Sequence, residues 1–376
     1  MLPLRTLRGL LKHRTDCDGM SLKRLECGSA ANGPLAEGCE HCMEGAKMVL
    51  LITGKCDTGC FYCPVSFEKK GLDVIYANEK RVFDMEGIFG EAVSMDATGT
   101  GITGGDPLEE CERTARAIEG LKGRFGKGHH IHLYTSTMDP VKVRTLAEAG
   151  LDEIRFHPPV RMWTRMEETA LKDIVGIPGL DVGLEVPALP DRERELDALL
   201  VYAESVGVRF VNLNELEFSE SNWDMMGDMG YGLKDELSSA VEGSEGLALR
   251  LIKRHRRLPV HFCSSSFKDG VQLRRRLIRR ANHIARDYDI VTEDGTLLKG
   301  VLYAEDLAAA EALLSVSYDV PAGLMHADPD RKRLEVASWV LERLAAELPY
   351  ECFIVEEYPT ADRLEVERMP LRRRDV

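Results

Sequence analysis

Short apolar, strand-like runs alternate with helical patterns from residue 46 onward. The runs are AKMVLLITG (46–54), ATGTGITGG (97–105), HIHLYTST (130–137), DEIRFHP (152–158), DVGLEVPAL (181–189), VRFVNLNEL (208–216) and PVHFCSS (259–265). Helical patterns fill most of the gaps, among them residues 84–95, 107–123 and 140–150. Strands in βα alternation pair in parallel, so the sequence predicts an α/β fold in which an open or closed barrel suits the strands better than a sandwich.

Two flanking regions do not follow this rhythm. Residues 1–45 carry Cys17, Cys27, Cys39 and Cys42 among glycines, with little periodic structure. Residues 287–376 predict a small α+β unit in the order β-β-α-α-β-β, which begins with a hairpin around EDGT. The sequence therefore predicts three parts: a Cys-rich N-terminal segment (1–45), a barrel (46–286) and a C-terminal α+β cap (287–376).

Length and cysteine usage narrow the class of protein. In 376 residues no apolar run reaches the roughly 18 residues of a membrane-spanning helix, and the N-terminus lacks the apolar core of a signal peptide. We therefore expect a cytoplasmic protein with no membrane partner. In that reducing compartment, clustered cysteines more often bind metals or act in catalysis than form disulfides.

The net charge of −14 argues against indiscriminate binding to polyanions. However, residues 250–286 contain twelve Lys and Arg residues against a single acid. Two interpretations stay open here. The segment forms the solvated face of a helix that packs through its leucines and isoleucines, or it binds a phosphate-bearing partner.

The cysteines admit a structural zinc site as one alternative. Cys39-x2-Cys42 and Cys60-x2-Cys63 have the spacing of a four-thiolate zinc site. That assignment leaves Cys56 without a role and requires an apolar strand to pass through the middle of the site.

The other alternative takes Cys56-x3-Cys60-x2-Cys63 as one unit on the loop that leaves the first strand. Three thiolates can hold three irons of a [4Fe–4S] cube, which is otherwise held by four cysteines. The fourth iron then keeps an open position for a small ligand, as a catalytic metal does.

This motif, with Tyr62 just before its last cysteine, resembles the signature of the radical S-adenosylmethionine (radical SAM) superfamily. The resemblance implies a partial (β/α)6 TIM-type barrel, with Cys56, Cys60 and Cys63 as ligands of a [4Fe–4S] cluster. Glycines after the second strand contact S-adenosylmethionine in that family, and GITGGDP supplies Gly104 and Gly105 here.

Within that superfamily, YCPVSFEKKG, YANE and HFCSSSFKD resemble archaeal-type proteins related to pyruvate formate-lyase activating enzyme. The resemblance implies reductive cleavage of S-adenosylmethionine to a 5′-deoxyadenosyl radical that abstracts hydrogen, with a low-potential electron donor as partner.

The same resemblance gives candidates for cofactor contacts beyond the glycines. They are Tyr62, Asp106, Thr135, His157 and Glu185, although the family more often has Glu at the position of Asp106. Thr135, His157 and Glu185 lie toward the carboxyl ends of predicted strands, where barrel enzymes place functional groups. Each also has a structural alternative: an ordinary β residue, a hydrogen-bonded strand-end histidine and a carboxylate in a polar interior, respectively.

Cys263 and Lys268, at the end of the last predicted strand, are catalytic candidates, although Cys263 also fits a small buried side chain. Cys17, Cys27, Cys39 and Cys42 are candidates for a second [4Fe–4S] cluster or a zinc site.

The sequence favours an enzyme that modifies a protein or peptide. Modification of RNA or of a phosphorylated metabolite is the alternative within the same chemistry. A zinc-stabilised RNA-binding protein without catalysis is the alternative from a different class.

Overall fold

The computed structural model describes residues 21–371, and its largest feature is an eleven-stranded sheet whose central strands are parallel. These strands follow one another in chain order across the sheet. They are β3 (Lys47–Leu51), β6 (Gly99–Thr103), β7 (His130–Thr135), β8 (Glu153–Phe156), β9 (Asp181–Ala188), β10 (Phe210–Glu215) and β11 (Val260–Cys263).

Each predicted strand corresponds to one of these parallel strands, and the mixed α/β class is confirmed. Antiparallel additions extend the sheet at both edges, so that it stays open. The additions are β4 (Ile75–Ala77) and β5 (Lys80–Val82) beside β3, and β2 (Ala30–Ala31) and β1 (Lys23–Arg24) beside β11.

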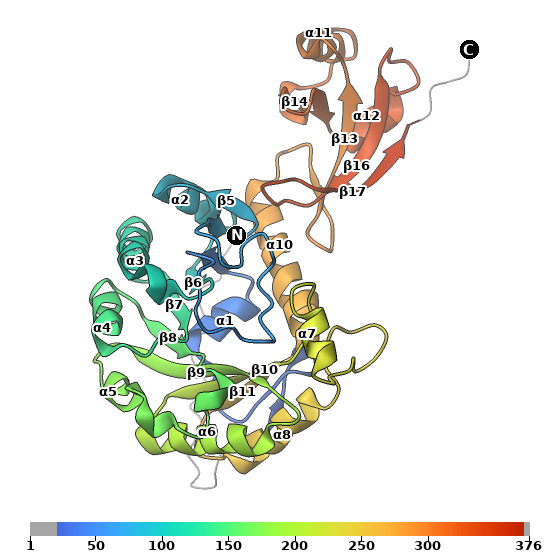
Figure 1. Ribbon diagram of the computed structural model, residues 1–376. Helices are drawn as coiled ribbons and strands as arrows, with labels where there is room; N and C mark the ends of the chain where they lie inside the picture. The colour runs from blue at the N-terminus through green and yellow to red at the C-terminus, as the bar shows by residue number, and fades with distance from the viewer. Residues whose placement is uncertain (1–20, 372–376) are drawn as a thin grey trace.

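Helices cover the outer side of the curved sheet (Figure 1). Sequence signals fix several of their ends: α4 starts at Pro140 behind the capping carboxylate of Asp139, and α6 ends at Val206, followed by Gly207 in a left-handed conformation. The helices of this part are α2 (Met85–Ser94), α3 (Cys111–Phe125), α4 (Pro140–Glu148), α5 (Leu171–Val175), α6 (Glu193–Val206), α7 (Trp223–Asp228), α8 (Ser244–Arg254), α9 (Ser265–Phe267) and α10 (Arg274–Ile284).

The prediction of little regular structure before residue 46 is wrong in one place. Residues Glu37–Met43 form helix α1, which contains Cys39 and Cys42 and lies on the inner side of the sheet (Figure 1). The Gly38 amide donates to Glu153 on β8 at 3.1 Å, and a Cβ at Gly38 would lie 2.5 Å from Nδ1 of His132. A helix of seven residues is too short to show its period in the sequence, but the sheet holds it in place.

The arginines of α10 pair with carboxylates from separate parts of the chain. These pairs are Arg274 with Asp294, Arg275 with Glu26, Arg276 with Glu79, Arg279 with Asp96 and Arg280 with Glu91. In α8, Arg250 and Arg254 pair with Glu193 on α6. The basic segment therefore joins elements of the fold, and the structure favours the structural interpretation over a phosphate-binding surface.

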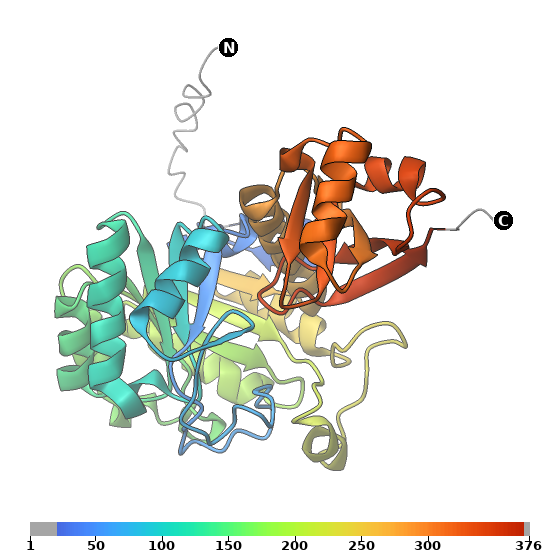
Figure 2. The ribbon, with the colours of Figure 1, turned by 90° about the horizontal axis from the view of Figure 1, so that it is seen from above.

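A second, antiparallel sheet lies beyond α10 and has its own apolar core, with Leu302, Leu334 and Leu341 fully buried (Figure 2). Its strands run in the order β14-β15-β13-β16-β17, with β12 paired to β13. The elements are β12 (Ile290–Val291), β13 (Leu297–Tyr303), α11 (Leu307–Ala312), β14 (Met325–Asp328), β15 (Arg333–Val336), α12 (Ser338–Leu344), β16 (Glu351–Glu357) and β17 (Glu365–Pro370). The predicted order of two consecutive helices is wrong, because the hairpin of β14 and β15 lies between them.

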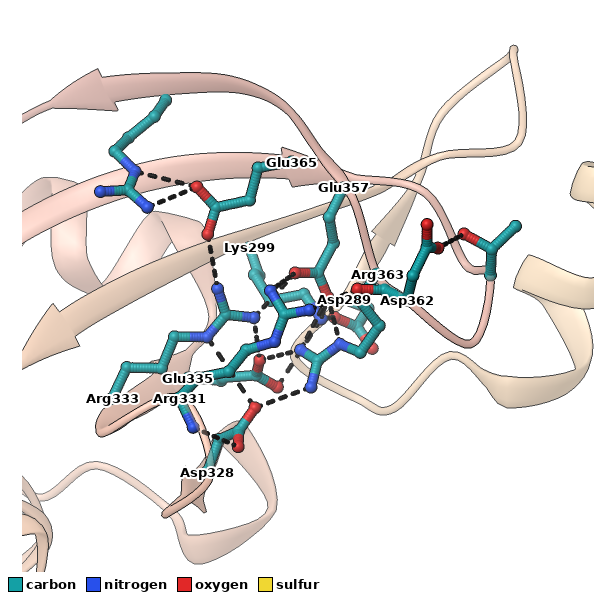
Figure 3. Close-up of polar contacts among 12 residues, drawn as sticks. Asp289, Lys299, Asp328, Arg331, Arg333, Glu335, Glu357, Asp362, Arg363 and Glu365 are labelled. Carbon is teal, nitrogen blue, oxygen red and sulfur yellow. Dashed lines mark hydrogen bonds and ion pairs between the residues drawn. The ribbon is translucent and has the colours of Figure 1, made fainter. Parts of the chain in front are cut away.

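Buried charges connect the strands of this second sheet (Figure 3). The Lys299 ammonium lies 2.9 Å from Asp289 and 3.0 Å from Glu357, and the Arg333 guanidinium lies 2.6 Å from Glu335 and 2.7 Å from Glu357. Buried charges are tolerated where they are paired. These pairs therefore fix the positions of β13, β15 and β16 relative to one another.

Among residues 21–371, none of the helices combines the length and the apolar character that a membrane crossing would need.

Candidate functional site

The loop that carries Cys56, Cys60 and Cys63 leaves β3 at its carboxyl end and returns to the same point. The Gly54 amide donates to the Leu72 carbonyl at 2.8 Å, and the Gly71 amide donates to the Gly54 carbonyl at 2.7 Å. These bonds close the loop at its base. The three cysteines therefore lie on a closed loop beside the parallel sheet.

The glycine pair after β6 packs directly on this loop. A Cβ at Gly104 would lie 2.3 Å from the Thr53 carbonyl oxygen, and one at Gly105 would lie 2.0 Å from the Lys55 carbonyl oxygen. The Gly105 amide donates to Thr53, and the Asp106 amide donates to Lys55 at 2.7 Å. Only glycine permits so close an approach of two backbones, so the pair fixes the start of the cysteine loop.

The three cysteines of the loop lie near one another. The pKa of the Cys60 thiol is raised, chiefly because the thiol is buried, and the neighbouring Cys56 and Cys63 thiolates add to the shift. Cys60 and Cys63 are half-buried, whereas Cys56 is exposed. In a cubic cluster each thiolate binds a different iron, so three ligands on such a loop fit a cluster without meeting at one point.

Within the part of the chain that the structure describes, no three His, Cys, Asp or Glu side chains converge where a single metal ion could sit. The zinc alternative of Cys39, Cys42, Cys60 and Cys63 therefore has no geometric support.

Asp106 binds a group of hydroxyls and amides at the end of β7. Its carboxylate accepts from the hydroxyls of Thr135, Ser136 and Thr137 at 2.5, 2.7 and 2.9 Å, and from the backbone amides of Leu108 and Ser136 at 3.0 and 3.1 Å. Asp106 and Thr135 are both almost fully buried. The structure thus brings these two predicted residues together, and the hydroxyl of Thr135 donates to Asp106.

Tyr62 and His157 also meet, although 95 residues separate them in the chain. The Tyr62 hydroxyl lies 3.0 Å from His157 Nε2, and His157 Nδ1 lies 2.7 Å from the Glu185 carbonyl oxygen. Because a carbonyl only accepts, His157 carries its proton on Nδ1, and Nε2 accepts from Tyr62. Burial lowers the pKa of His157 and raises that of Tyr62, so both stay neutral near pH 7.

Glu185, on β9, lies inside the sheet among donors from the two neighbouring strands, β8 and β10. Its carboxylate accepts from Arg155 at 2.8 Å, from Asn212 at 2.9 Å and from Asn214 at 3.0 Å. Burial alone would raise the pKa of Glu185, but Arg155 and the two amides lower it to about 2. Glu185 is therefore a fixed anion.

The neighbouring interior contains buried polar atoms that lack a hydrogen-bond partner among the described residues. They are Nδ1 of His130, His132 and His261, Nη2 of Arg155 and Oδ1 of Asn212.

Cys263 and Lys268 lie at the carboxyl end of β11. Burial raises the pKa of the Cys263 thiol, and the Lys268 ammonium pairs with Glu217 at 2.6 Å. The thiol therefore stays protonated near neutral pH, whereas Lys268 keeps its charge through its acidic partner.

The N-terminal cysteines are spread over two places. Cys17 lies outside the described residues. Cys27 is exposed beside Gly270, whereas Cys39 is buried and its sulfur accepts from Asn212 at 3.3 Å. Cys42 shares α1 with Cys39.

Sequence reasoning missed several residues of this region. Ser136 and Thr137 stand in the run YTST, a signal that was available. Arg155 stands between Glu153 and His157 at period two, which places polar side chains on one face of a buried strand. Asn222 gave no signal, because its role depends on a contact with Tyr62, 160 residues away.

Comparison with known proteins found a relative that matches most of the chain and a family that matches its C-terminal part. A protein from Methanocaldococcus jannaschii, named "putative glycyl-radical enzyme activating enzyme", is 38% identical over 353 residues, covering 90% of this chain and 93% of its own length. Residues 295–371 match a family described as a domain of unknown function (DUF8061).

Proposed function

The chain belongs to the radical SAM family, and on that premise we propose that it is an enzyme that generates a radical from S-adenosylmethionine to modify a protein or peptide. The observation that carries the proposal is the cysteine loop at the carboxyl end of β3, closed at its base and held against Gly104 and Gly105. A loop that is fixed at its base in this way can present three thiolates to one cluster.

Cys56, Cys60 and Cys63 are proposed to hold a [4Fe–4S] cluster with one iron open to S-adenosylmethionine. When bound, the cluster supplies the electron that cleaves the sulfonium to methionine and a 5′-deoxyadenosyl radical. The chain itself binds and orients the nucleotide and excludes water from the radical.

The proposed nucleotide site combines backbone and side-chain groups. Gly104 and Gly105 offer backbone groups next to the cysteine loop, and Tyr62, directly before Cys63, offers an aromatic ring. Asp106 and Thr135 position the hydroxyls at the end of β7, and these hydroxyls face the loop through the contact of Ser136 with Thr58 at 2.8 Å.

We propose that two half-buried residues, His157 and Glu185, support the nucleotide site from the side of β8 and β9. His157 fixes the Tyr62 ring, and Glu185 fixes Arg155 and the two asparagine side chains of β10. Because Arg155 balances the charge of Glu185, the proposed role of Glu185 is a polar contact and not attraction of the sulfonium by net charge.

We propose that the open sheet is the partial (β/α)6 barrel of this family, with residues 46–286 as its domain. The parallel strands in chain order and the helices outside them support this proposal. Residues 1–45 and 287–376 are proposed as an N-terminal segment and a C-terminal cap.

A protein or peptide is the proposed substrate, in line with the name of the relative. Cys263 and Lys268, at the carboxyl end of β11, are the candidates for contact with it. An RNA or a phosphorylated metabolite is less favoured, because many arginines of the basic segment already pair with carboxylates.

A second metal site formed by Cys17, Cys27, Cys39 and Cys42 stays a separate proposal. Metal analysis of a Cys39→Ala/Cys42→Ala variant tests it, because a second cluster predicts a loss of about half of the iron and a zinc site predicts a loss of zinc alone.

Anaerobic reconstitution followed by electron paramagnetic resonance tests the main proposal. We expect a reduced cluster whose spectrum changes when S-adenosylmethionine is added, together with release of 5′-deoxyadenosine. Cys56→Ala, Cys60→Ala and Cys63→Ala should each abolish that spectrum, whereas the matched control Cys111→Ala, on α3, should keep it. A colourless protein that contains only zinc would overturn the proposal.

A further inference from the structure

The connection between β10 and α8 carries residues 216–241, which we call the α7 segment. Three contacts tie it to the cysteine loop. The Ser221 hydroxyl donates to the Cys63 carbonyl at 3.0 Å, and the Asn222 amide donates to the Tyr62 carbonyl at 3.1 Å. The rings of Phe61 and Tyr231 stack with centroids 5.8 Å apart and planes 5° apart. Whatever contacts the α7 segment therefore lies next to the cysteine loop.

The outer surface of this segment is unusually apolar. Trp223 and Met225 are each 52% exposed, Met229 is 46% exposed and Leu237 is fully exposed. Of the residues in α7, only Met226 is buried. Large apolar side chains that gather on a surface mark interaction sites, and tryptophan and methionine are common at them. Figure 2 shows α7 and its loop projecting from the body of the molecule.

The same segment is acidic. Its exposed carboxylates are Glu220, Asp224, Asp228, Asp235 and Glu236, and none of them forms an ion pair among the described residues. Its one cation, Lys234, already pairs with Glu245 at 2.8 Å. Because like charges repel, this surface disfavours nucleic acids and anionic membranes and favours a cationic partner.

We propose that the α7 segment is the docking surface for the polypeptide that the enzyme modifies, and that it binds a basic, apolar stretch of that polypeptide. This inference rests on the proposed function and names the chemistry of its substrate. Trp223 and Met225 supply the apolar contact, and the unpaired carboxylates supply the charge. Ser221 and Asn222 hold the α7 segment against the cysteine loop, so the docked polypeptide lies beside that loop.

Peptide binding to the reconstituted enzyme tests the proposal. The probes are a labelled 20-residue peptide of leucine and lysine, a matched peptide with glutamate for lysine, and one with serine for leucine. We expect micromolar affinity for the leucine–lysine peptide alone, measured by fluorescence anisotropy. Trp223→Ser/Met225→Ser and Asp224→Asn/Asp228→Asn should each weaken it about tenfold, and the second variant should also reduce its salt dependence.

The matched control is Phe83→Ser, which removes another exposed apolar residue, 81% exposed, before α2. It should leave the affinity unchanged. Equal binding by the control and the Trp223 variant, or preference for the acidic peptide, would overturn the proposal. A concentration-dependent dimer that Trp223→Ser abolishes would also overturn it by assigning the surface to a second copy of this chain.

The binding assay needs no turnover, so the two proposals fail separately. If the peptide binds as expected but no 5′-deoxyadenosine forms, the proposed function fails and the docking surface stands. If 5′-deoxyadenosine forms in both the parent and Trp223→Ser, and substitutions in the α7 segment do not change the peptide affinity, the docking surface fails and the proposed function stands.

Discussion

The Tyr62 hydroxyl donates to Nε2 of His157 at 3.0 Å, so the cysteine loop after β3 is held by a residue that follows β8. The other ring nitrogen of His157 is bound to the Glu185 carbonyl at 2.7 Å. The ring thus links the loop to β9 as well. The position of the proposed nucleotide site depends on strands from opposite halves of the parallel sheet.

This contact predicts energetic coupling between Tyr62 and His157. Tyr62→Phe leaves Nε2 of the half-buried His157 without its donor, so we expect a loss of about 1–3 kcal/mol in the free energy of unfolding. Because the residues touch, the double variant Tyr62→Phe/His157→Phe should lose less than the sum of the two single variants. Denaturant unfolding of the three variants measures the coupling, which should be about 0.5–3 kcal/mol. Additive losses would show that the hydrogen bond contributes nothing.

Buried histidines predict a fall in stability below pH 6.5. Burial lowers the pKa of both His129 and His261 to about 4, whereas both titrate near 6.5 in the unfolded chain. Between these values the unfolded chain binds more protons. Each histidine then removes up to about 1.4 kcal/mol of unfolding free energy per pH unit as the pH falls from 6.5 toward 4, and removes nothing above 6.5.

Denaturant unfolding at pH 7.5, 6.5 and 5.5 measures this dependence. His261→Gln should reduce its slope below pH 6.5 by about one proton, whereas Asn282→Gln, at an exposed site without a titrating group, should not. Equal slopes in the parent and His261→Gln would contradict the prediction.

The carboxylate of Asp106 predicts a large effect from a small change. Asp106→Asn replaces one acceptor oxygen by a donor that faces hydroxyls and amides already bound to the parent carboxylate. We expect a loss on the order of 3 kcal/mol in unfolding free energy and weaker binding of S-adenosylmethionine. The matched control is Asp84→Asn, since Asp84 caps α2 through the Gly87 amide at 2.8 Å and asparagine caps a helix equally well. A loss of equal size in both variants would contradict the assigned role of Asp106.

The parallel strands could be predicted from the sequence because each is a short strand-like run with apolar residues, and helical patterns separate most of the runs from one another. The hairpin of β14 and β15 could not, because each strand has four residues and β15 carries Arg333 and Glu335 toward a buried ionic network. Those charges give a polar pattern that is typical of an exposed turn. Their burial depends on partners from β16 and β17, which no local pattern contains.

The candidate site divides in the same way. The cysteine loop and the glycine pair could be located because their spacing is local. The contacts of Tyr62 with His157 and Asn222 join residues 95 and 160 positions apart, so only the folded chain reveals them. Glu185 was expected in a polar interior, but its partner Arg155 was overlooked because the charged residues of β8 do not indicate which strand they contact.

The ionic network of the second sheet predicts that its buried and exposed arginines contribute unequally to the free energy of unfolding. The Arg333 guanidinium is buried and contacts Glu335, Glu357 and Glu365, so Arg333→Met would remove the one cation among the described residues that contacts all three of these carboxylates. Removing one partner of a buried pair costs about 3–5 kcal/mol. Arg368 contacts Glu365 at the surface, and Arg368→Met should cost less than about 1 kcal/mol.

This sheet has its own apolar core, so we expect Arg333→Met to unfold the C-terminal part before the larger sheet. Hydrogen exchange in β13, β15 and β16 measures that order. The cations also lower the pKa of Glu335 to about 2, so the stability that this carboxylate provides is complete above about pH 4.5 and is lost as the pH falls toward 2. Uniform exchange across both sheets in Arg333→Met would show that the network stabilises the chain as one unit.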